Sequence, residues 1–294
     1  MTYLGGRLFL VVFSVILLVH SALAQELGDI VYVSWGELCS ISSDIGRNSI
    51  CINTQKEFGS PCWKPHSSER LVVEAGEHDG LHTLVLMDRV GRIIRTLSGS
   101  ADHIRPAWSP DGRHIYAISY GLGNAIARWD SEGRNRVVVP VINPNQPDRG
   151  FQMISFSPSG RLAALLTMHF REMVIVKVTD SNLLVQKVLP QGFKYVSQSV
   201  WIDEDRLLFV GKKNSDRGEL WELNVSDGIV TRRGIDGLWL RDQIAISPDR
   251  DSIAVTAVMD NTVTEWNLWK FSLRTGMTTK LTKGTEDVDP TWRR

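Results

Sequence analysis

The stretch Arg105-Pro106-Ala107-Trp108-Ser109-Pro110-Asp111-Gly112 is the fullest copy of a pattern that the chain repeats six times. The other copies are looser and centre on Trp63, Phe156, Trp201, Ile246 and Trp292. With Trp108 included, successive anchors are separated by 45, 48, 45, 45 and 46 residues. Repeats of this length are typical of β-propeller blades with four strands each. The spacing therefore predicts an all-β, six-bladed propeller.

A tight turn and an apolar strand follow the anchor in most copies. Pro110 fixes φ for a turn, and Asp111-Gly112 supplies two residues that tolerate left-handed geometry. The strands expected after these turns are Arg113–Ser119, Arg161–Thr167, Arg206–Gly211 and Ser252–Ala257. Later strands expected in the repeats include Ala125–Asp130, Val137–Pro140 and Glu219–Asn224. Four strands per repeat make one blade.

The two ends of the chain complement each other. Residues 29–54 supply three strands, Asp29–Ser34, Glu37–Ser42 and Asn48–Asn53, and lack the anchor strand that begins every complete repeat. Residues 287–294 supply an anchor strand and nothing more. We therefore expect the C-terminal segment to be the innermost strand of the N-terminal blade, which closes the ring without a free sheet edge.

The N-terminus has the pattern of an export signal. Arg7 gives a short positive region, Leu8–Val19 is apolar apart from Ser14, and Ala22-Leu23-Ala24 is a small-x-small cleavage site. We expect a signal peptide over residues 1–24 and one propeller domain over residues 25–294, in the periplasm or secreted. An uncleaved anchor is the alternative, although the apolar run is shorter than the roughly 20 residues of a bilayer span.

The charge balance bears on the class of partner. Removing residues 1–24 takes away one basic residue and no acidic one, which leaves 32 basic and 33 acidic side chains. This near neutrality argues against nucleic acid as a partner. After cleavage no segment is long and apolar enough to span a membrane, and we expect a monomer.

Three cysteines, Cys39, Cys51 and Cys62, lie near the start of the expected mature chain. Cys39 and Cys51 are symmetric about Ile45, so a hairpin there would set them opposite each other, and a disulfide between them is one expectation for an exported protein. Three small buried hydrophobic residues are the alternative. The odd count leaves at least one free thiol or an intermolecular link, and no spacing suggests zinc.

The Trp-Ser-Pro-Asp-Gly turn that begins at Trp108 resembles the repeats of TolB-like, or WD40-like, propellers. Partial copies of this turn begin at Phe156 and Ile246, and the resemblance covers nearly all of residues 29–294. The copies at Trp201 and Ile246 lack the turn glycine. It implies an exported six-bladed propeller that acts through protein contacts in the bacterial envelope. TolB itself carries an α/β domain ahead of its propeller; we expect a relative without that domain, whose partner does not carry over.

Alternating strand directions place two sets of loops on one face of the ring: those between the second and third strands, and those that lead to the next blade. Aromatic and Arg-rich loops suit a protein interface. The candidate partner-binding residues on this face are Trp35, His103, Tyr120, His169, Phe170, Arg171, Tyr195, Lys212, Arg217 and Trp239. The same loops include the long Val141–Gly150 insertion and Glu286-Asp287.

A cation site is an alternative use of the same face. His78 and His82, with Glu74, Glu77 and His103, could surround a divalent cation, as histidines and carboxylates do in metal-dependent propeller lyases. His78 and His82 lie in the turn-like segment Glu77-His78-Asp79-Gly80-Leu81-His82, so the helical spacing argument for metal pairs does not apply. Solvated loop histidines are the simpler interpretation, and we expect no cofactor.

The ten tryptophans divide into two groups. Those that recur at the blade period, Trp63, Trp108, Trp129, Trp201, Trp221 and Trp292, are expected to pack between blades. The remaining ligand candidates are Trp35, Trp239, Trp266 and Trp269.

The sequence favours a non-enzymatic propeller that binds an envelope or extracellular protein through its loops. A small propeller enzyme, for example a cation-dependent lyase, or a carbohydrate-binding module near His78, His82 and His103 is the second hypothesis. A third is a structural propeller whose partner domain is encoded elsewhere. Hydrolase chemistry has no support, because the sequence contains no Gly-x-Ser-x-Gly elbow, and there is no Gly-rich phosphate loop.

Overall fold

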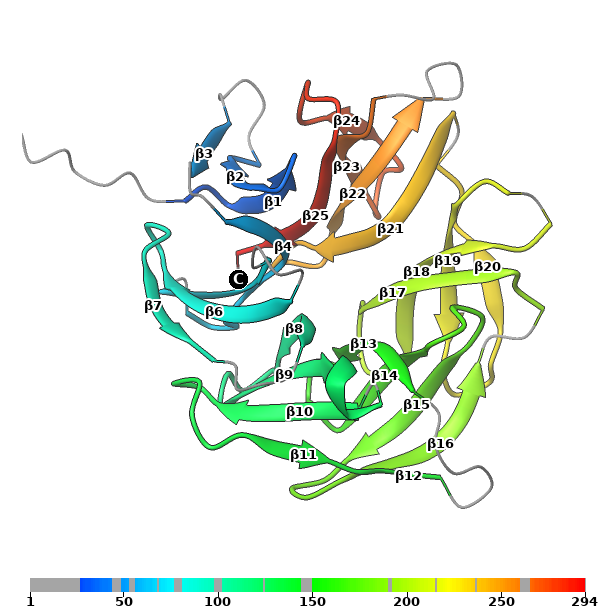
Figure 1. Ribbon diagram of the computed structural model, residues 1–294. Helices are drawn as coiled ribbons and strands as arrows, with labels where there is room; N and C mark the ends of the chain where they lie inside the picture. The colour runs from blue at the N-terminus through cyan, green and yellow to red at the C-terminus, as the bar shows by residue number, and fades with distance from the viewer. Residues whose placement is uncertain are drawn as a thin grey trace, which may run out of the picture.

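The computed structural model forms a ring of six β-sheets around a central axis (Figure 1). It describes residues 27–43, 49–52, 56–67, 69–76, 81–97, 102–123, 125–143, 150–189, 192–214, 216–235, 237–259 and 265–293. The six-bladed propeller expected from the repeat spacing is confirmed. The expected signal peptide, residues 1–24, lies outside the described residues.

The innermost strand of every blade ends at a repeat anchor. These strands are β25 (Asp287–Trp292), β4 (Glu57–Trp63), β8 (His103–Trp108), β13 (Phe151–Phe156), β17 (Tyr195–Trp201) and β21 (Leu238–Ile246), in blades 1 to 6. Their last residues are the six anchors of the sequence pattern. The repeat therefore marks the point where each innermost strand leaves the axis and turns back.

Three further strands extend each blade outward in antiparallel order. The second strands are β1 (Ile30–Ser34), β5 (Arg70–Gly76), β9 (His114–Ser119), β14 (Leu162–Thr167), β18 (Arg206–Lys212) and β22 (Ser252–Met259). The third strands are β2 (Glu37–Ile41), β6 (His82–Asp88), β10 (Ala125–Asp130), β15 (Met173–Val178), β19 (Glu219–Asn224) and β23 (Asn267–Ser272). The outer strands are β3 (Ile50–Ile52), β7 (Ile93–Thr96), β11 (Val137–Val139), β16 (Leu183–Leu189), β20 (Val230–Arg232) and β24 (Thr278–Lys280).

Strand β25 closes the ring by pairing with β1. The pairing runs from Ile30 opposite Trp292 to Ser34 opposite Asp287, and Figure 1 shows the red C-terminal strand beside the blue N-terminal one. Strand β25 is also bonded to both neighbouring blades: the Asp287 amide donates to the Trp266 carbonyl at 2.9 Å, and the Ser60 amide donates to Asp289 Oδ2 at 3.2 Å. The expected closure through the two termini is confirmed.

Recurrent tryptophans hold neighbouring blades together. The indole of Trp108 donates to the Cys62 carbonyl of the preceding blade at 3.2 Å, and Trp201 donates to the Ser155 carbonyl in the same way. Trp129, which is fully buried, donates to the Leu97 carbonyl at 3.0 Å. These contacts confirm that tryptophans repeating at the blade period serve inter-blade packing.

The turn of blade 4 lacks the aspartate of the Ser-Pro-Asp-Gly motif and receives a replacement from the next blade. In the full motif, Ser109 Oγ donates to Asp111 Oδ1 at 2.6 Å, and Gly112 has φ of 67°. Ser159 stands at the aspartate position of blade 4, and there the carboxylate of Glu204 in blade 5 accepts from the Ser159 amide at 2.6 Å.

Blade 6 lacks the turn glycine instead. Arg250 takes its place with φ of 62° and donates from its guanidinium to the Ile202 carbonyl of blade 5 at 2.9 Å. A left-handed conformation costs about 1 kcal/mol or more for a residue other than glycine. The inter-blade hydrogen bond offsets part of that cost.

Blade 4 departs from the four-stranded plan. A short strand, β12 (Val141–Ile142), leaves the end of blade 3 and pairs in parallel with β16, which gives this sheet five strands. The segment from Val141 was expected to be a loop insertion. Pro140 separates β11 from β12 and lacks the amide hydrogen that would continue a ladder, so the chain changes sheets there.

A disulfide joins β2 to β3 in the closing blade. Cys39 and Cys51 are direct cross-strand partners, and their sulfur atoms are bonded to each other. The disulfide that was one of the two expectations from the sequence is therefore present. Cys62 in β4 is not part of a disulfide. The disulfide fixes the short outer strand of blade 1 to the sheet that contains both ends of the chain.

Deletion of residues 287–294 tests the closure. The truncated chain is expected to aggregate or to lose cooperative unfolding, because β1 becomes an unpaired edge and the neighbouring blades lose their contacts with β25. Thermal unfolding followed by circular dichroism, with size-exclusion chromatography, measures this. An unchanged melting temperature and a monodisperse truncated protein would contradict the closure.

The double variant Cys39→Ser/Cys51→Ser tests the disulfide. A cross-link that closes a loop of this length stabilises a fold by about 3 kcal/mol in the chain-entropy model, so urea denaturation should show a loss of that order. Cys62→Ser is the matched control and should change the free energy of unfolding by much less. Equal losses in the two variants would show that the disulfide does not stabilise blade 1.

Candidate functional site

The antiparallel order of the strands gathers two sets of loops on one side of the ring, which we call the loop face. It comprises the connections between second and third strands and those between each outer strand and the next innermost strand. Nine of the ten predicted partner-binding residues lie at or beside these connections with some exposure to solvent: Trp35, Tyr120, His169, Phe170, Arg171, Tyr195, Lys212, Arg217 and Trp239.

Large apolar side chains are exposed at the connections between second and third strands in five blades. Their exposed fractions run from 37% for Tyr120 to 74% for Trp35. These residues, which we call the apolar tips, are Trp35, Leu81, Tyr120, Leu122, Met168 and Met259. Single exposed apolar residues are ordinary on protein surfaces, but a set that recurs around one face indicates an interaction surface.

A stacked aromatic pair bridges blades 4 and 5. Phe170 lies parallel to Tyr195 with ring centroids 5.6 Å apart, and the Lys212 ammonium lies 5.3 Å from the Tyr195 centroid. Phe170 has φ of 54°, and its carbonyl accepts from the Val196 amide at 2.6 Å. The turn of blade 4 is therefore tied to the innermost strand of blade 5, which places three predicted residues in contact.

Further cation–aromatic pairs lie on blades 5 and 6. The Arg217 guanidinium is 4.4 Å from the centroid of Trp239, and Lys213 lies over Phe193 and Trp221 at 5.3 and 5.6 Å. Each such pair contributes roughly 0.5–1 kcal/mol at an exposed site. They hold long basic side chains in defined positions on the loop face.

Arg241 and Trp266 form a last pair at the seam between blades 6 and 1. The guanidinium is 5.3 Å from the indole centroid and forms a short ion pair with Glu286. The sequence identified Trp266 as a ligand candidate but did not single out Arg241. Its position in the middle of β21 gave no sign that it reaches the loop face.

His103 does not lie on the exposed surface, contrary to expectation. It is the first residue of β8 rather than part of a loop, and its side chain is 0% exposed. Its ring meets Trp129 edge-on at 4.9 Å, and neither ring nitrogen has a hydrogen-bond partner among the described residues. Burial, followed by the charge of Arg136, lowers the pKa of His103 to about 4.

Glu74 of β5 and His82 of β6 lie close together at the loop-face end of blade 2. His82 Nδ1 is 2.9 Å from Glu74 Oε1, and Glu74 Oε2 accepts from the Arg105 amide at 3.2 Å. Burial raises the pKa of Glu74, while the Arg105 amide and His82 oppose that rise. The other candidate ligands in this segment, Glu77 and His78, lie outside the described residues.

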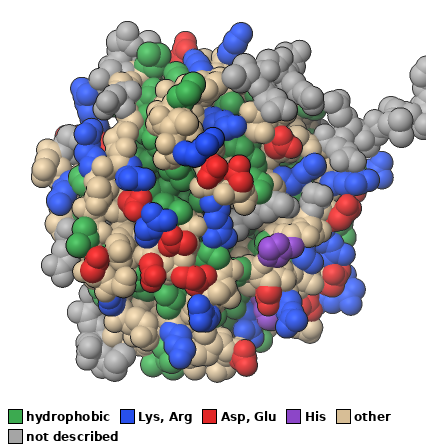
Figure 2. All heavy atoms as spheres, turned by 180° about the vertical axis from the view of Figure 1, so that it is seen from behind, with side chains coloured by type: hydrophobic (Ala, Val, Ile, Leu, Met, Phe, Trp, Pro, Cys, Tyr) green, Lys and Arg blue, Asp and Glu red, His purple; other side chains and the backbone are tan. Residues whose placement is uncertain are grey.

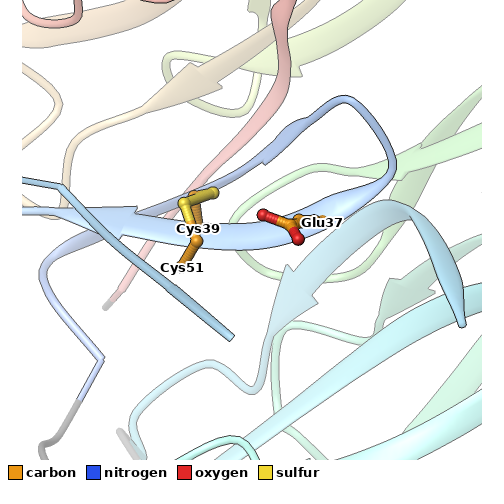
Figure 3. Close-up of side chains that lie close together, drawn as sticks. All are labelled: Glu37, Cys39 and Cys51. Carbon is orange, nitrogen blue, oxygen red and sulfur yellow. A yellow bond between two sulfur atoms is a disulfide. The ribbon is translucent and has the colours of Figure 1, made fainter. Parts of the chain in front are cut away.

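Within the described part of the chain, one group of three potential metal ligands lies close together: Glu37, Cys39 and Cys51 (Figure 3). The two sulfur atoms in this group are bonded to each other, so they are not thiolate ligands in this state. Glu74 and His82 therefore lie close together without a third potential ligand from the described residues.

The axial cavity is narrow. It has a volume of about 140 Å³ and is lined by residues of all six innermost strands, for example Cys62, Ala107, Ser155, Ser199 and Ala245. Small-molecule sites usually enclose about 300–1,000 Å³. The loop face, rather than the interior of the ring, offers the larger surface for recognition.

The opposite side of the molecule from the view in Figure 1 carries both signs of charge. Figure 2 shows acidic and basic side chains interspersed over the described part of that side. This agrees with the near-neutral composition. The described part of that side therefore has no broad patch of positive charge of the kind that binds nucleic acid.

Comparison with known proteins identifies the fold. TolB from Acinetobacter baumannii matches with a TM-score of 0.69 at 16% identity, over 90% of this chain and 66% of that one. A candidate TolB from Agrobacterium tumefaciens matches with a TM-score of 0.64 at 14% identity, over 82% and 87% of the two chains. The chain therefore has the propeller fold of these TolB proteins and spans about two thirds of the length of the first.

Other propellers share the architecture more loosely. An oligogalacturonate lyase in complex with manganese matches with a TM-score of 0.53 at 12% identity, over 88% of this chain and 74% of that one. No protein-family model and no curated protein matches the sequence.

Among the described residues, no helix has the length and apolar character needed to cross a membrane.

The buried His103 gives a pH-dependent prediction. Its pKa is about 4 in the folded chain and about 6.5 when unfolded, so between these values the unfolded state binds the extra proton. Stability should therefore fall as pH decreases from about 6.5 to 4, by about 3 kcal/mol from this group. The variant His103→Phe retains an aromatic ring beside Trp129 but has no imidazole to protonate there. Its free energy of unfolding should therefore fall less over the same pH range.

Urea denaturation at several pH values measures the effect. His169→Asn is the control, because it removes an exposed histidine from the same face. If His103→Phe loses as much stability on acidification as the wild type does, the buried neutral imidazole is not its cause.

Proposed function

We propose that the chain is a non-enzymatic propeller, exported to the periplasm or beyond the cell, that binds another protein through its loop face. The observation that carries this proposal is the set of apolar tips, which recurs on five of the six blades. Exposed apolar groups surrounded by polar residues are typical of protein interaction sites. The aromatic and basic residues beside them are the types that dominate binding energy at such sites.

The support for export comes from the N-terminal sequence and the disulfide, and does not depend on the loop face. The N-terminal sequence has the order of a signal peptide, and the Cys39–Cys51 disulfide suits an oxidising compartment. A mature protein that begins at Gln25 is the expected product.

A cation-dependent lyase acting on an acidic oligosaccharide is the second candidate. The observation in its favour is the shared architecture with the manganese-bound oligogalacturonate lyase. Against it, the Glu74–His82 pair gains no third ligand from the described residues. We therefore rank protein binding first.

Crosslinking and affinity capture from the native envelope test the proposal. The chain should capture a defined protein, and the variant Trp35→Ser/Met168→Ser/Met259→Ser should lose most of it, because three exposed apolar contacts are removed from the loop face. The matched control is Ile229→Ser/Met277→Ser, since both residues are exposed at turns of the opposite face.

Two outcomes would contradict protein binding through this face. One is equal capture by the loop-face variant and the control. The other is capture of no protein together with stoichiometric bound metal and cleavage of an acidic oligosaccharide, which would favour the lyase.

A further inference from the structure

The outer strand of blade 2, β7, differs from the outer strands of the other blades. Every residue of Ile93–Thr96 is exposed, and so is Arg92 before them. In the described part of the chain, each of the other outer strands includes at least one residue that is buried or half-buried. Strand β7 lies at the outer edge of the ring (Figure 1) and is therefore open to solvent on both of its faces.

Strand β7 is also open along one edge. It ends its sheet, in the order β4-β5-β6-β7, so its outer edge has no strand partner among the described residues. Ile93 and Ile94 are 45% and 49% exposed. An exposed apolar edge strand is a template on which another extended segment can pair through backbone hydrogen bonds.

The charge beside β7 is positive on balance. The Arg95 side chain lies against Gly133, so β7 adjoins the turn that leads into β11. Residues 88–97 and 130–139 together contain five basic and three acidic side chains: Arg89, Arg92, Arg95, Arg134 and Arg136, with Asp88, Asp130 and Glu132.

The ion-pair partners of these segments do not remove the excess. Arg89 pairs with Glu69, and Glu132 pairs with Arg70, which adds one charge of each sign and gives six basic and four acidic side chains. Lys64, whose charge also acts on Glu132, adds to the basic side.

Arg92 and Arg95 carry the positive charge of β7 itself. Neither of them forms an ion pair within the described part of the chain. Asp88, the acidic residue of the same hairpin, accepts hydrogen bonds from the Val90 and Arg92 amides at 3.0 and 2.9 Å, so its carboxylate is engaged in the turn. The two arginines are therefore the charges that a ligand meets along the strand.

We infer that the outer edge of β7 binds an extended, acidic segment of another polypeptide, which adds to the sheet as a further strand with its carboxylates beside Arg92 and Arg95. Opposite charges on facing strands stabilise their pairing. Ile93 and Ile94 would pack against apolar side chains that alternate with the acidic ones. This edge is on the rim of the ring and is separate from the loop face, so the inference goes beyond the proposed function.

A second copy of the chain and a lipid surface fit β7 less well. Two copies that pair through β7 would set arginines against arginines, and like charges on facing strands are destabilising. An anionic bilayer attracts arginine, but its hydrocarbon offers no hydrogen-bonding groups to an open strand edge. An acidic polypeptide satisfies both the charges and the backbone.

Isothermal titration of the full chain with a short synthetic peptide that alternates Glu and Val tests the inference. Binding should weaken as salt increases. The variant Arg92→Glu/Arg95→Glu should weaken it by about tenfold or more. The matched control is Arg274→Glu/Lys280→Glu, which makes the same change in net charge on the outer hairpin of blade 6 and should bind as the wild type does.

Peptides methylated at alternate backbone nitrogens distinguish strand addition from attraction of charge alone. Methyl groups on the amides that face β7 should abolish binding, whereas methyl groups on the other alternate set should leave it in place, because those amides point away from the sheet. Equal binding of both methylated peptides, equal loss in both charge variants, or equal binding of a peptide with Lys in place of each Glu would overturn the inference.

Two further measurements complete the test. Melting curves identify a charge variant that fails to fold, and Arg92→Gln/Arg95→Gln then repeats the comparison. Sedimentation with vesicles of phosphatidylcholine and phosphatidylglycerol examines the lipid alternative: vesicle binding that depends on Arg92 and Arg95, without peptide binding, would overturn the inference. Partner capture that depends on the apolar tips would still leave the proposed function standing.

Discussion

Antiparallel pairing of β25 with β1 joins the two ends of the chain in one sheet, and the other blades depend on that pairing for a continuous ring. Each blade buries its faces only against its two neighbours. Strand β25 lies between blades 6 and 2 and is hydrogen bonded to both, through Asp287 and Asp289. Loss of this strand would expose the edge of β1 and one side of each neighbouring core.

The closed ring also explains how the loop face holds its shape. The turn of blade 4 is bonded to β17 through Phe170 and Val196, and the Glu74 carboxylate of blade 2 receives the Arg105 amide of blade 3. These bonds cross between blades near the face itself. Side chains far apart in sequence, such as Phe170 and Tyr195 or Arg241 and Glu286, therefore meet because their blades are fixed relative to one another.

Much of this architecture was predictable, because a propeller repeats its packing and the sequence repeats with it. The anchors mark the ends of the innermost strands, and the incomplete repeats at the two ends predict closure. The compensation for incomplete motifs was not predictable, because it is non-local: Glu204 completes the turn of another blade, and Arg250, at the glycine position of blade 6, donates to a carbonyl of blade 5. Strand β12 was missed because two residues that change sheets after a proline carry no periodicity.

The site was predictable in outline but not in detail. Nine of the proposed surface residues lie at the loop face with some exposure, whereas His103 is buried, because it is the first residue of β8 and its side chain packs against Trp129. Most of the apolar tips were missed because single Leu and Met residues carry no signal alone. Their common position becomes visible only when the blades are superimposed.

Hydrogen exchange of β25 measures the closure most directly. A ring closed through the two termini predicts that amides of β25 and β1 that are bonded to each other exchange as slowly as those of β14, in one cooperative unit with the other blades. Rapid exchange throughout β25, at the rate of an unfolded segment while β14 stays protected, would contradict the closure. The ring would then be open in solution, and closure by β25 could not be what fixes the arrangement of the loop face.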